Sequence, residues 1–312
     1  MTFRLSPGQL RSLLPALSLT FLLLAIFHLE PRAMSYFGLN LLLNLAVPIA
    51  LATIAQMFVI TVNDLDLSIG AYVGFTACVA ATWLNDAPLL GVAALVGCIA
   101  VYAAVGVLIQ LRNLPAIVVT LGMSFVWQGL SVLLLPIPGG RAPGWLQTLM
   151  SLHTPFLPFA IFAAVGIGAI VHFGLMRSAY GVVLRGAGGN ARSVSRAGWS
   201  MVKVKAVMYA FAGLFGALSG LALVGLTTSA DANIALRYTL LSIAGVILGG
   251  GEFVGGRVSP MGAVIGATTL TLAASFLSFL RLNPDWQIGA QGAILIFVLA
   301  LRMLINRAER RA

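Results

Sequence analysis

The sequence predicts an all-α integral membrane protein with about ten transmembrane segments, some of them short or broken. Hydrophobic residues make up 60% of the 312-residue chain and charged residues only 8%, far from the composition of a soluble domain. The hydrophobic residues gather in stretches close to the ~20 residues that a helix needs to cross about 30 Å of hydrocarbon. We therefore expect a single transmembrane domain over residues 1–312, without a soluble domain.

The predicted segments follow one another closely. They lie at 12–28, 39–61, 67–83, 88–110, 115–136, 155–176, 204–227, 239–250, 260–280 and 286–305. No small-x-small cleavage pattern follows the first one, so we expect a retained helix rather than a secretory signal. The segment 239–250 is too short to span comfortably and ends in three glycines, which indicates a half-helix.

Lysines and arginines fall unequally on the two sides of this predicted bundle. With ten crossings and the amino terminus inside, fourteen of the 18 lie on the inner side. The outer four are Arg32, Arg141, Arg237 and Arg281. Because basic loops stay cytoplasmic, we expect both termini in the cytoplasm. In the largest outer loop, 136–154, we expect Trp145 and Leu146 to anchor an interfacial hairpin.

The chain offers little chemistry of its own. Its only lysines, Lys203 and Lys205, lie outside any G-x-x-x-x-G-K-[ST] loop, so it cannot hydrolyse a nucleotide by the P-loop route. Three histidines and two cysteines are scattered without metal-ligand spacing. The basic residues are separated by apolar spans and form no nucleic-acid motif. We expect no catalytic residue, no metal site, no enzymatic activity and no nucleic-acid partner.

The most informative stretch is a polar, cationic insert at 180–199, YGVVLRGAGGNARSVSRAGW. Asn190 is a favourable N-cap for about two helical turns over 191–197. Gly198 then suits a left-handed C′ position, with Trp199 as the apolar contact that follows. We predict a short helix nearly parallel to the membrane that presents a docking surface to a cytoplasmic partner. The alternative is a solvated basic loop that serves topology alone.

Two further polar stretches flank predicted spans. Carboxylates in the first, NDLDLSIG at 63–70, mark either a functional site or a structural network, and Asp66 and Ser68 either cap the next helix or take part in gating. In the second, 249–262, Ser259 is a candidate N-cap and Glu252 can pair with Arg257. The structural or gating candidates are Asp64, Asp66, Ser68, Gly70, Gly249, Gly250, Glu252 and Gly256.

Five stretches together carry a resemblance to one family. They are DLSIG (66–70), LPAIVVTLG (114–122) with Gln128, Gly129 and Leu130 after it, the 180–199 insert, ILGGGEFVGGRVSPMGAVIGA (247–267) and NPDWQIGAQGAILI (283–296). They resemble the transmembrane permease subunits of ATP-binding-cassette (ABC) importers of the ribose or monosaccharide type, which are related more distantly to the branched-chain amino acid permeases. The resemblance covers most of the chain from residue 62 onward, and the 180–199 block is highly specific.

The resemblance implies a permease subunit of the bacterial cytoplasmic (inner) membrane. Its implied partners are membrane lipid, cytoplasmic ABC ATPase subunits, an external solute-binding protein and a second permease chain, in either a homodimer or a heterodimer. No cofactor is expected on this chain, because ATP and Mg belong to the ATPase. By position, 190–197 matches the family's coupling helix, which docks on the ATPase. The expected coupling residues are Arg185, Gly189, Asn190, Arg192, Ser195, Arg196 and Gly198.

The chain departs from the family pattern at three places. Residues 63–65 read Asn-Asp-Leu where Gly-Gly-Ile usually precedes the Asp-Leu-Ser. Residues 238–241 read Tyr-Thr-Leu-Leu in place of a segment that often has an acidic pair, and Gly-Glu at 251–252 replaces a Thr-Ser pair. These changes fit one half of a heterodimer whose partner keeps the more usual residues.

We predict uptake of a small polar solute, a monosaccharide or similar polyol, by alternating access. Few charges lie at membrane depth, which argues against an ionic substrate and against an acidic proton relay. Uncharged polar residues at span depth are candidates for the substrate pathway, or else serve as interhelical contacts. They are Gln56, Asn63, Thr120, Gln128 and Gln291. The alternative function is a self-contained secondary carrier or channel, in which the 180–199 insert is a plain loop.

Overall fold

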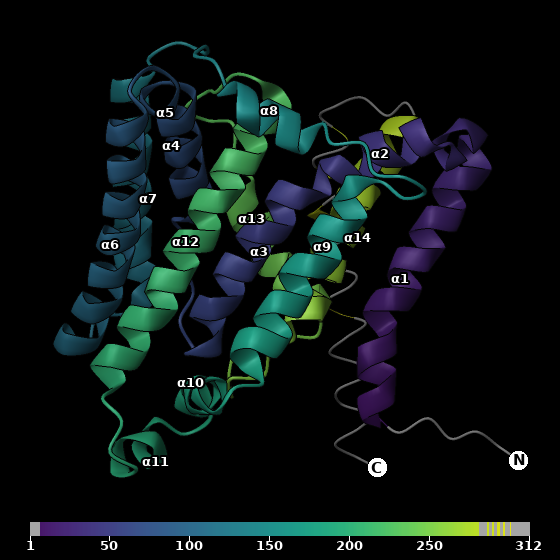
Figure 1. Cartoon of the computed structure of the whole chain (residues 1–312). Helices are drawn as coiled ribbons and strands as arrows, with labels where there is room; N and C mark the ends of the chain where they lie inside the picture. The colour runs from purple at the N-terminus through teal and green to yellow at the C-terminus, as the bar shows by residue number, and fades with distance from the viewer. Residues whose placement is uncertain are drawn as a thin grey trace, which may run out of the picture.

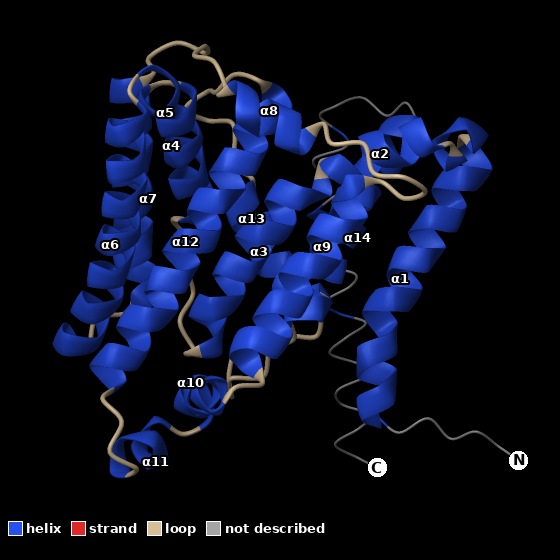
Figure 2. Ribbon diagram, in the orientation of Figure 1, coloured by secondary structure: helices blue, strands red, loops and turns tan. Residues whose placement is uncertain are grey.

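The structure, a computed structural model, describes residues 7–280 and, beyond them, Trp286, Gly289, Gly292, Ala293, Ile296 and Ala300. In this part of the chain the fold is all-helical, apart from an isolated bridge between Gly139 and Ala230 (Figure 2). The elements are α1 (Pro7–Leu29), η1 (Pro31–Met34), α2 (Tyr36–Asn44), α3 (Ala46–Thr61), α4 (Ile69–Ala81), α5 (Trp83–Asp86), α6 (Pro88–Arg112), α7 (Ala116–Leu134), α8 (Gly144–Met150), α9 (Phe159–Ala169), η2 (Ile170–Met176), α10 (Ala179–Gly189), α11 (Ala191–Arg196), α12 (Met201–Thr227), α13 (Tyr238–Leu248) and α14 (Pro260–Phe279).

Six helical stretches among the described residues are long and apolar enough to cross a membrane. They are Tyr36–Thr61, Pro88–Arg112, Ala116–Leu134, Phe159–Met176, Met201–Thr227 and Pro260–Phe279. Shorter apolar helices occupy Pro15–Leu29 and Tyr238–Leu248. Each predicted segment from 12–28 to 260–280 contains a helix, but the predicted count of ten spans is not confirmed. Most of the predicted segment 286–305 lies outside the described residues.

Helices α3 and α4 form the centre of the bundle. Every residue of both helices is buried, as expected of helices that are apolar on all sides. α12 packs against α3, α4 and α6, and α14 packs against α1, α3 and α13 (Figure 1). By contrast, α6 and α7 expose much of their apolar surface, which suits helices that face lipid or another chain.

The short helices lie at opposite ends of the bundle, with α10 and α11 at one end and α5 and α8 at the other (Figure 1). The insert at 180–199 and the loop at 136–154 are therefore separated by the length of the bundle. The prediction for this loop is wrong for Leu146, which is buried against α12 beside Gly225. Adjacent residues of a helix point in different directions, and Trp145 of α8 is 58% exposed.

Helices α13 and α14 form a pair joined by the glycine-rich stretch. α13 ends at Leu248, immediately before the glycine run at 249–251, as the sequence predicts. α14 begins at Pro260, where the Ser259 hydroxyl accepts a hydrogen bond from the Gly262 N–H at 3.1 Å, the predicted N-cap. The two helices then pack closely along their length.

Gly262→Ala is expected to destabilise the protein, because the added Cβ would stand 1.8 Å from the carbonyl oxygen of Gly249. Overpacking typically costs about 1–3 kcal/mol, and backbone atoms cannot swing aside as a flexible side chain does. Thermal unfolding in detergent measures the effect. The control is Gly97→Ala on α6, where a Cβ would meet nothing within 4 Å. Equal melting temperatures for the two variants would contradict the close backbone contact.

Candidate functional site

The non-helical loop at 62–68, which joins α3 to α4, holds a fully buried carboxylate, that of Asp66. One oxygen of this carboxylate accepts hydrogen bonds from the Ser68 N–H and the Ser68 hydroxyl, both at 2.7 Å. The other oxygen accepts one from the Tyr102 hydroxyl of α6 at 2.5 Å. An unpaired charge is costly inside a protein, so these donors are what allow Asp66 to be buried.

The capping role expected of Ser68 is not observed. Ser68 occupies the N-cap of α4, but its side chain makes no capping hydrogen bond. Its hydroxyl instead lies 2.7 Å from the Asp66 carboxylate and 2.9 Å from the Tyr102 hydroxyl. The two residues belong to a buried polar network.

Two more polar side chains hold the backbone of the 62–68 loop. The Gln56 amide of α3, in the orientation that satisfies both of its ends, donates to the Asp66 carbonyl at 3.1 Å and accepts from the Asp66 N–H at 3.2 Å. The Thr120 hydroxyl of α7 accepts from the Leu67 N–H at 3.1 Å. Both side chains are buried. These two substrate-pathway candidates therefore direct their hydrogen bonds to the loop.

The carboxylate of Asp64 is held by α12. Lys205 Nζ lies 2.8 Å from one of its oxygens and 3.0 Å from the other, and the Tyr209 hydroxyl donates to it at 3.1 Å. The Lys205 and Asp64 side chains are only 13% and 11% exposed. Removing one partner of so sheltered a pair leaves a charge without compensation, so this contact fixes the loop to the start of α12.

Asn63 joins two segments that are distant in the sequence. Its side-chain nitrogen donates to the Gly188 carbonyl at the end of α10 at 2.7 Å. Its side-chain oxygen accepts from the Gly255 N–H in the glycine-rich stretch at 3.0 Å. The backbone of Asn63 has a φ of +60°, a left-handed conformation that asparagine tolerates better than most residues.

Around Asn63, α10 and the glycine-rich stretch meet by backbone contact. A Cβ on Gly188 would stand 2.0 Å from the Thr61 carbonyl oxygen. A Cβ on Gly256, whose φ is +65°, would stand 2.2 Å from the Arg185 carbonyl oxygen. The predicted structural glycine at 256 is thus required by both its conformation and its neighbours.

The predicted helix in the 180–199 insert is present as α11. The Asn190 side chain accepts from the Ser193 N–H at 3.0 Å, which confirms the N-cap. Gly198 has a φ of +88° and, with Trp199, closes the helix in a Schellman motif. Its two hydrogen bonds run from the Gly198 N–H to the Ser195 carbonyl at 3.0 Å and from the Trp199 N–H to the Val194 carbonyl at 3.3 Å. The Trp199 ring packs on Tyr180 of α10, with 5.5 Å between centroids.

Helix α11 presents an exposed cationic surface. None of its residues is buried, and Arg192, Ser195 and Arg196 are all exposed. Gly189 is exposed, whereas Arg185 of α10 is partly buried. A helix this short gains little stability on its own, so its two caps and the ring contact with α10 hold it in place. The two arginines are therefore exposed on a helix whose position is fixed.

The 62–68 loop and the side chains that bond it form a polar cluster. The remaining predicted residues lie either near this cluster or apart from it. The Gly70 N–H donates to the Thr239 hydroxyl of α13 at 3.0 Å. The Glu252 carboxylate is 4.0 Å from the Arg257 guanidinium, the predicted pair. The Gln128 amide of α7 donates to the Asn233 side chain, away from the 62–68 loop. Gln291 lies outside the described residues. Gly249 and Gly250 follow α13, and Gly250 has a φ of +98°.

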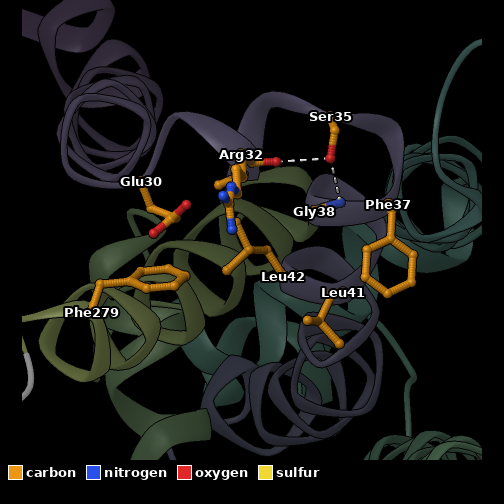
Figure 3. A pocket seen from close by; sticks show the side chains of 9 residues that line it. Glu30, Arg32, Ser35, Phe37, Gly38, Leu41, Leu42 and Phe279 are labelled. Atoms are coloured by element: carbon orange, nitrogen blue, oxygen red, sulfur yellow. Dashed lines mark hydrogen bonds between the residues drawn. The ribbon is translucent and has the colours of Figure 1, made fainter.

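A separate pocket of about 460 Å³ opens at the far end of the bundle, between η1, α2 and the end of α14 (Figure 3). Its walls are mostly apolar and include Leu41, Leu42 and Phe279, with Glu30 and Arg32 at one side. Pockets of this composition offer few partners for a polar solute, and this one shares no lining residue with the polar loop.

Sequence reasoning missed three residues of the cluster. They are Tyr102, Lys205 and Tyr209, whose side chains meet the loop from α6 and α12. Lys205 carried the stronger signal, because it is one of two lysines in the chain and lies within a stretch otherwise able to span a membrane. No sequence signal distinguishes the two tyrosines from residues that serve only in packing.

Fold and cluster together define a multi-pass α-helical membrane protein with a capped, exposed helix at one end and an irregular polar loop inside the bundle. Residues 38–299 match the family described as "Branched-chain amino acid transport system / permease component". The chain belongs to this family.

Relatives that align with this chain over most of their own length are named as transport permeases. The chain is 28% identical over 307 residues to the galactose/methyl galactoside import permease protein MglC of Escherichia coli (strain K12), covering 91% of each chain. It is 26% identical over 293 residues to the ribose import permease protein RbsC of the same strain, covering 89% of this chain and 90% of the relative. A probable ABC transporter permease protein, YphD, is 26% identical over 302 residues. No solved structure matches.

Tyr102→Phe is expected to destabilise the protein by about 1–3 kcal/mol, because the buried Asp66 carboxylate loses a hydrogen-bond donor and gains none from water. Chemical unfolding in detergent, followed by tryptophan fluorescence, measures the change. Tyr180→Phe removes a hydroxyl from a partly buried ring outside the cluster and is the control. A Tyr102 variant as stable as the control would show that this donor is dispensable.

Proposed function

We propose that the chain is the permease subunit of an ABC importer that takes up a monosaccharide by alternating access. The observation that carries the proposal is α11, a helix of six residues capped at both ends and exposed at one end of the bundle. Membership of the permease family and likeness to galactose and ribose import permeases support the same conclusion.

The energy for transport comes from a separate cytoplasmic ATPase subunit, which binds ATP and Mg. α11 docks on that subunit through an exposed face that includes Arg192 and Arg196, four residues apart on the helix. Closure of the ATPase pair displaces α11 and shifts the permease between outward- and inward-open states. The motor acts through α11 because its caps make it a short rigid body.

The remaining partners follow from the same mechanism. An external solute-binding protein delivers the sugar to the end of the bundle opposite α11, where α5 and α8 lie. A second permease chain completes the pathway, and membrane lipid surrounds the pair in the bacterial inner membrane. The exposed apolar surfaces of α6 and α7 suit lipid or that second chain.

A neutral polar substrate fits the distribution of charge. In the described part of the bundle, the Asp64 carboxylate is paired with Lys205 and that of Asp66 is hydrogen-bonded by Ser68 and Tyr102. Carboxylates held in this way are poorly suited to relay protons or to recognise a cation. Uncharged amides and hydroxyls can bind sugar hydroxyls by hydrogen bonds, and Gln128 beside Asn233 is the candidate pair.

A self-contained secondary carrier or channel is the competing function. It predicts solute flux driven by an ion gradient or by the solute gradient alone, without a second subunit. The capped α11 has no task in such a protein, which is why the ABC importer is favoured.

The direct experiment reconstitutes the chain in proteoliposomes with its ATPase and solute-binding protein and tests a panel of monosaccharides. ATP-dependent uptake of one sugar, stimulated by the binding protein, is the expected result. Uptake that persists without the ATPase would favour the carrier, and failure of the ATPase to copurify would contradict docking.

Gly198→Val is expected to uncouple ATP hydrolysis from uptake. A β-branched residue resists the φ of +88° that ends α11, although a Cβ at this position would meet nothing within 4 Å. The effect therefore acts through the backbone of the cap and not through a clash. Uptake per ATP hydrolysed is the measurement.

The matched control for this variant is Ala197→Val, one residue earlier, where φ is −77° and valine is tolerated. The control is expected to transport like the wild type. Wild-type uptake in the Gly198 variant would count against the role of α11.

A further inference from the structure

The two helices that flank α11 in the chain both reach the same loop. α10 precedes α11, and its Gly188 carbonyl accepts from the Asn63 side chain. α12 follows α11, and its Lys205 and Tyr209 side chains bind the carboxylate of Asp64. Any displacement of α11 moves the ends of α10 and α12, and both of those ends are tied to neighbouring residues of the 62–68 loop.

We propose that Asn63 and Asp64 transmit the displacement of α11 to the centre of the bundle. This inference rests on the proposed function and adds to it the residues that link the docking helix with the interior. The two are positioning residues, because they act through the loop and not on the substrate. We call the contacts of Asn63 with Gly188 and Gly255, and of Asp64 with Lys205 and Tyr209, the 63–64 link.

The far half of the loop makes the link effective. Residues from Leu65 to Ser68 are held by α3, α6 and α7 through Gln56, Tyr102 and Thr120. α4 begins directly after the loop, is buried along its whole length, and contacts α13 where the Gly70 N–H donates to Thr239. A displacement at the 63–64 link therefore moves the start of α4, because the loop between them is not free to absorb it.

Asn63 suits this task for three reasons. Its amide donates to one segment and accepts from another, so one side chain couples α10 to the glycine-rich stretch. Its backbone φ of +60° excludes most other residues that could make both bonds. The glycines at 188 and 256 let α10 approach Thr61, directly before the loop, and let the glycine-rich stretch approach α10 at backbone distance. Glycine at position 63 would keep the backbone but lose both hydrogen bonds.

Asp64 makes the stiffer half of the link. Its partners Lys205 and Tyr209 are four residues apart, so they lie on one face of α12 about one turn from each other. The ion pair is largely sheltered from water. Screening therefore weakens its charge–charge attraction less than it would weaken that of an exposed pair. The first turns of α12 and the loop are therefore expected to move as one body.

The test compares two matched pairs of variants in the complete complex with its ATPase and binding protein. The first pair is Asn63→Gly and Asn113→Gly. Asn113 also has a left-handed backbone, with φ +50°, but lies exposed at the end of α6 and is not part of the link. The second pair is Lys205→Met and Lys203→Met, which remove the two lysines of the chain, one in the link and one exposed.

The readouts are copurification of the ATPase, its rate of ATP hydrolysis, and sugar uptake per ATP hydrolysed. For Asn63→Gly we expect assembly and hydrolysis to be retained and uptake per ATP to fall about fivefold, the equivalent of about 1 kcal/mol of lost coupling. For Lys205→Met we expect a larger fall in the same ratio. The two control variants are expected to keep the wild-type ratio.

Three outcomes would overturn the inference. A wild-type ratio in both link variants shows that the displacement takes another route. Loss of assembly in the link variants, with intact controls, shows that these residues serve stability alone. An equal fall in the control variants shows that the effect is not specific to the link. If the wild-type complex itself shows no ATP-dependent uptake, the proposed function fails, and this result is distinct from the other three.

Discussion

Polar groups inside a membrane bundle must find hydrogen-bond partners within the protein, and those of the 62–68 loop find them on five helices. Gln56 of α3 and Thr120 of α7 bond the backbone of the loop. Its side chains are bonded by Tyr102 of α6, the Gly188 carbonyl of α10, and Lys205 and Tyr209 of α12. Each unsatisfied polar group would cost several kcal/mol in such surroundings. The arrangement of the bundle at this point is therefore set by the need to satisfy one short loop.

The same constraint explains why carboxylates occur in so apolar a protein. Asp64 ties the loop to α12, and Asp66 closes the loop on itself and on α6. Glycines complete the arrangement from the other side, because Gly188 lets α10 approach the carbonyl of Thr61, directly before the loop, and Gly256 lets the glycine-rich stretch approach the backbone of α10. The hydrogen bonds of the loop and the close backbone contacts at the glycines together connect the exposed end of the bundle with its buried centre.

Local rules predicted much of the structure from sequence. The all-α class, the caps of α11 at Asn190 and Gly198, and the end of α13 before the glycine run follow from composition, capping preferences and backbone conformation. The predicted number of spans is not confirmed, because several predicted segments hold helices too short to count as spans by length, and a helix surrounded by protein need not be as long as one that faces lipid. α4, with 13 residues, is the clearest case.

The sequence alone could not predict the hydrogen-bond partners of the buried carboxylates. Tyr102 lies 36 residues from Asp66, and Lys205 lies 141 residues from Asp64. Side chains so far apart in the chain are brought together only by helix packing, for which a single sequence gives no pairing signal. Leu146 was misplaced for a related reason, since the direction of a residue on a short helix depends on what packs beside it.

In the proposed mechanism, α11 faces the cytoplasm and is bound there by an ATPase. Ser195 is exposed on α11, and the native Cys78 and Cys98 are buried, so Ser195→Cys offers one accessible thiol among the residues the structure describes. Cross-linking of this thiol to the copurified ATPase, with the yield measured with and without ATP, is the most direct measurement. The expected result is a cross-link whose yield changes with nucleotide. Labelling of the same thiol by a membrane-impermeant reagent added outside intact cells would contradict it.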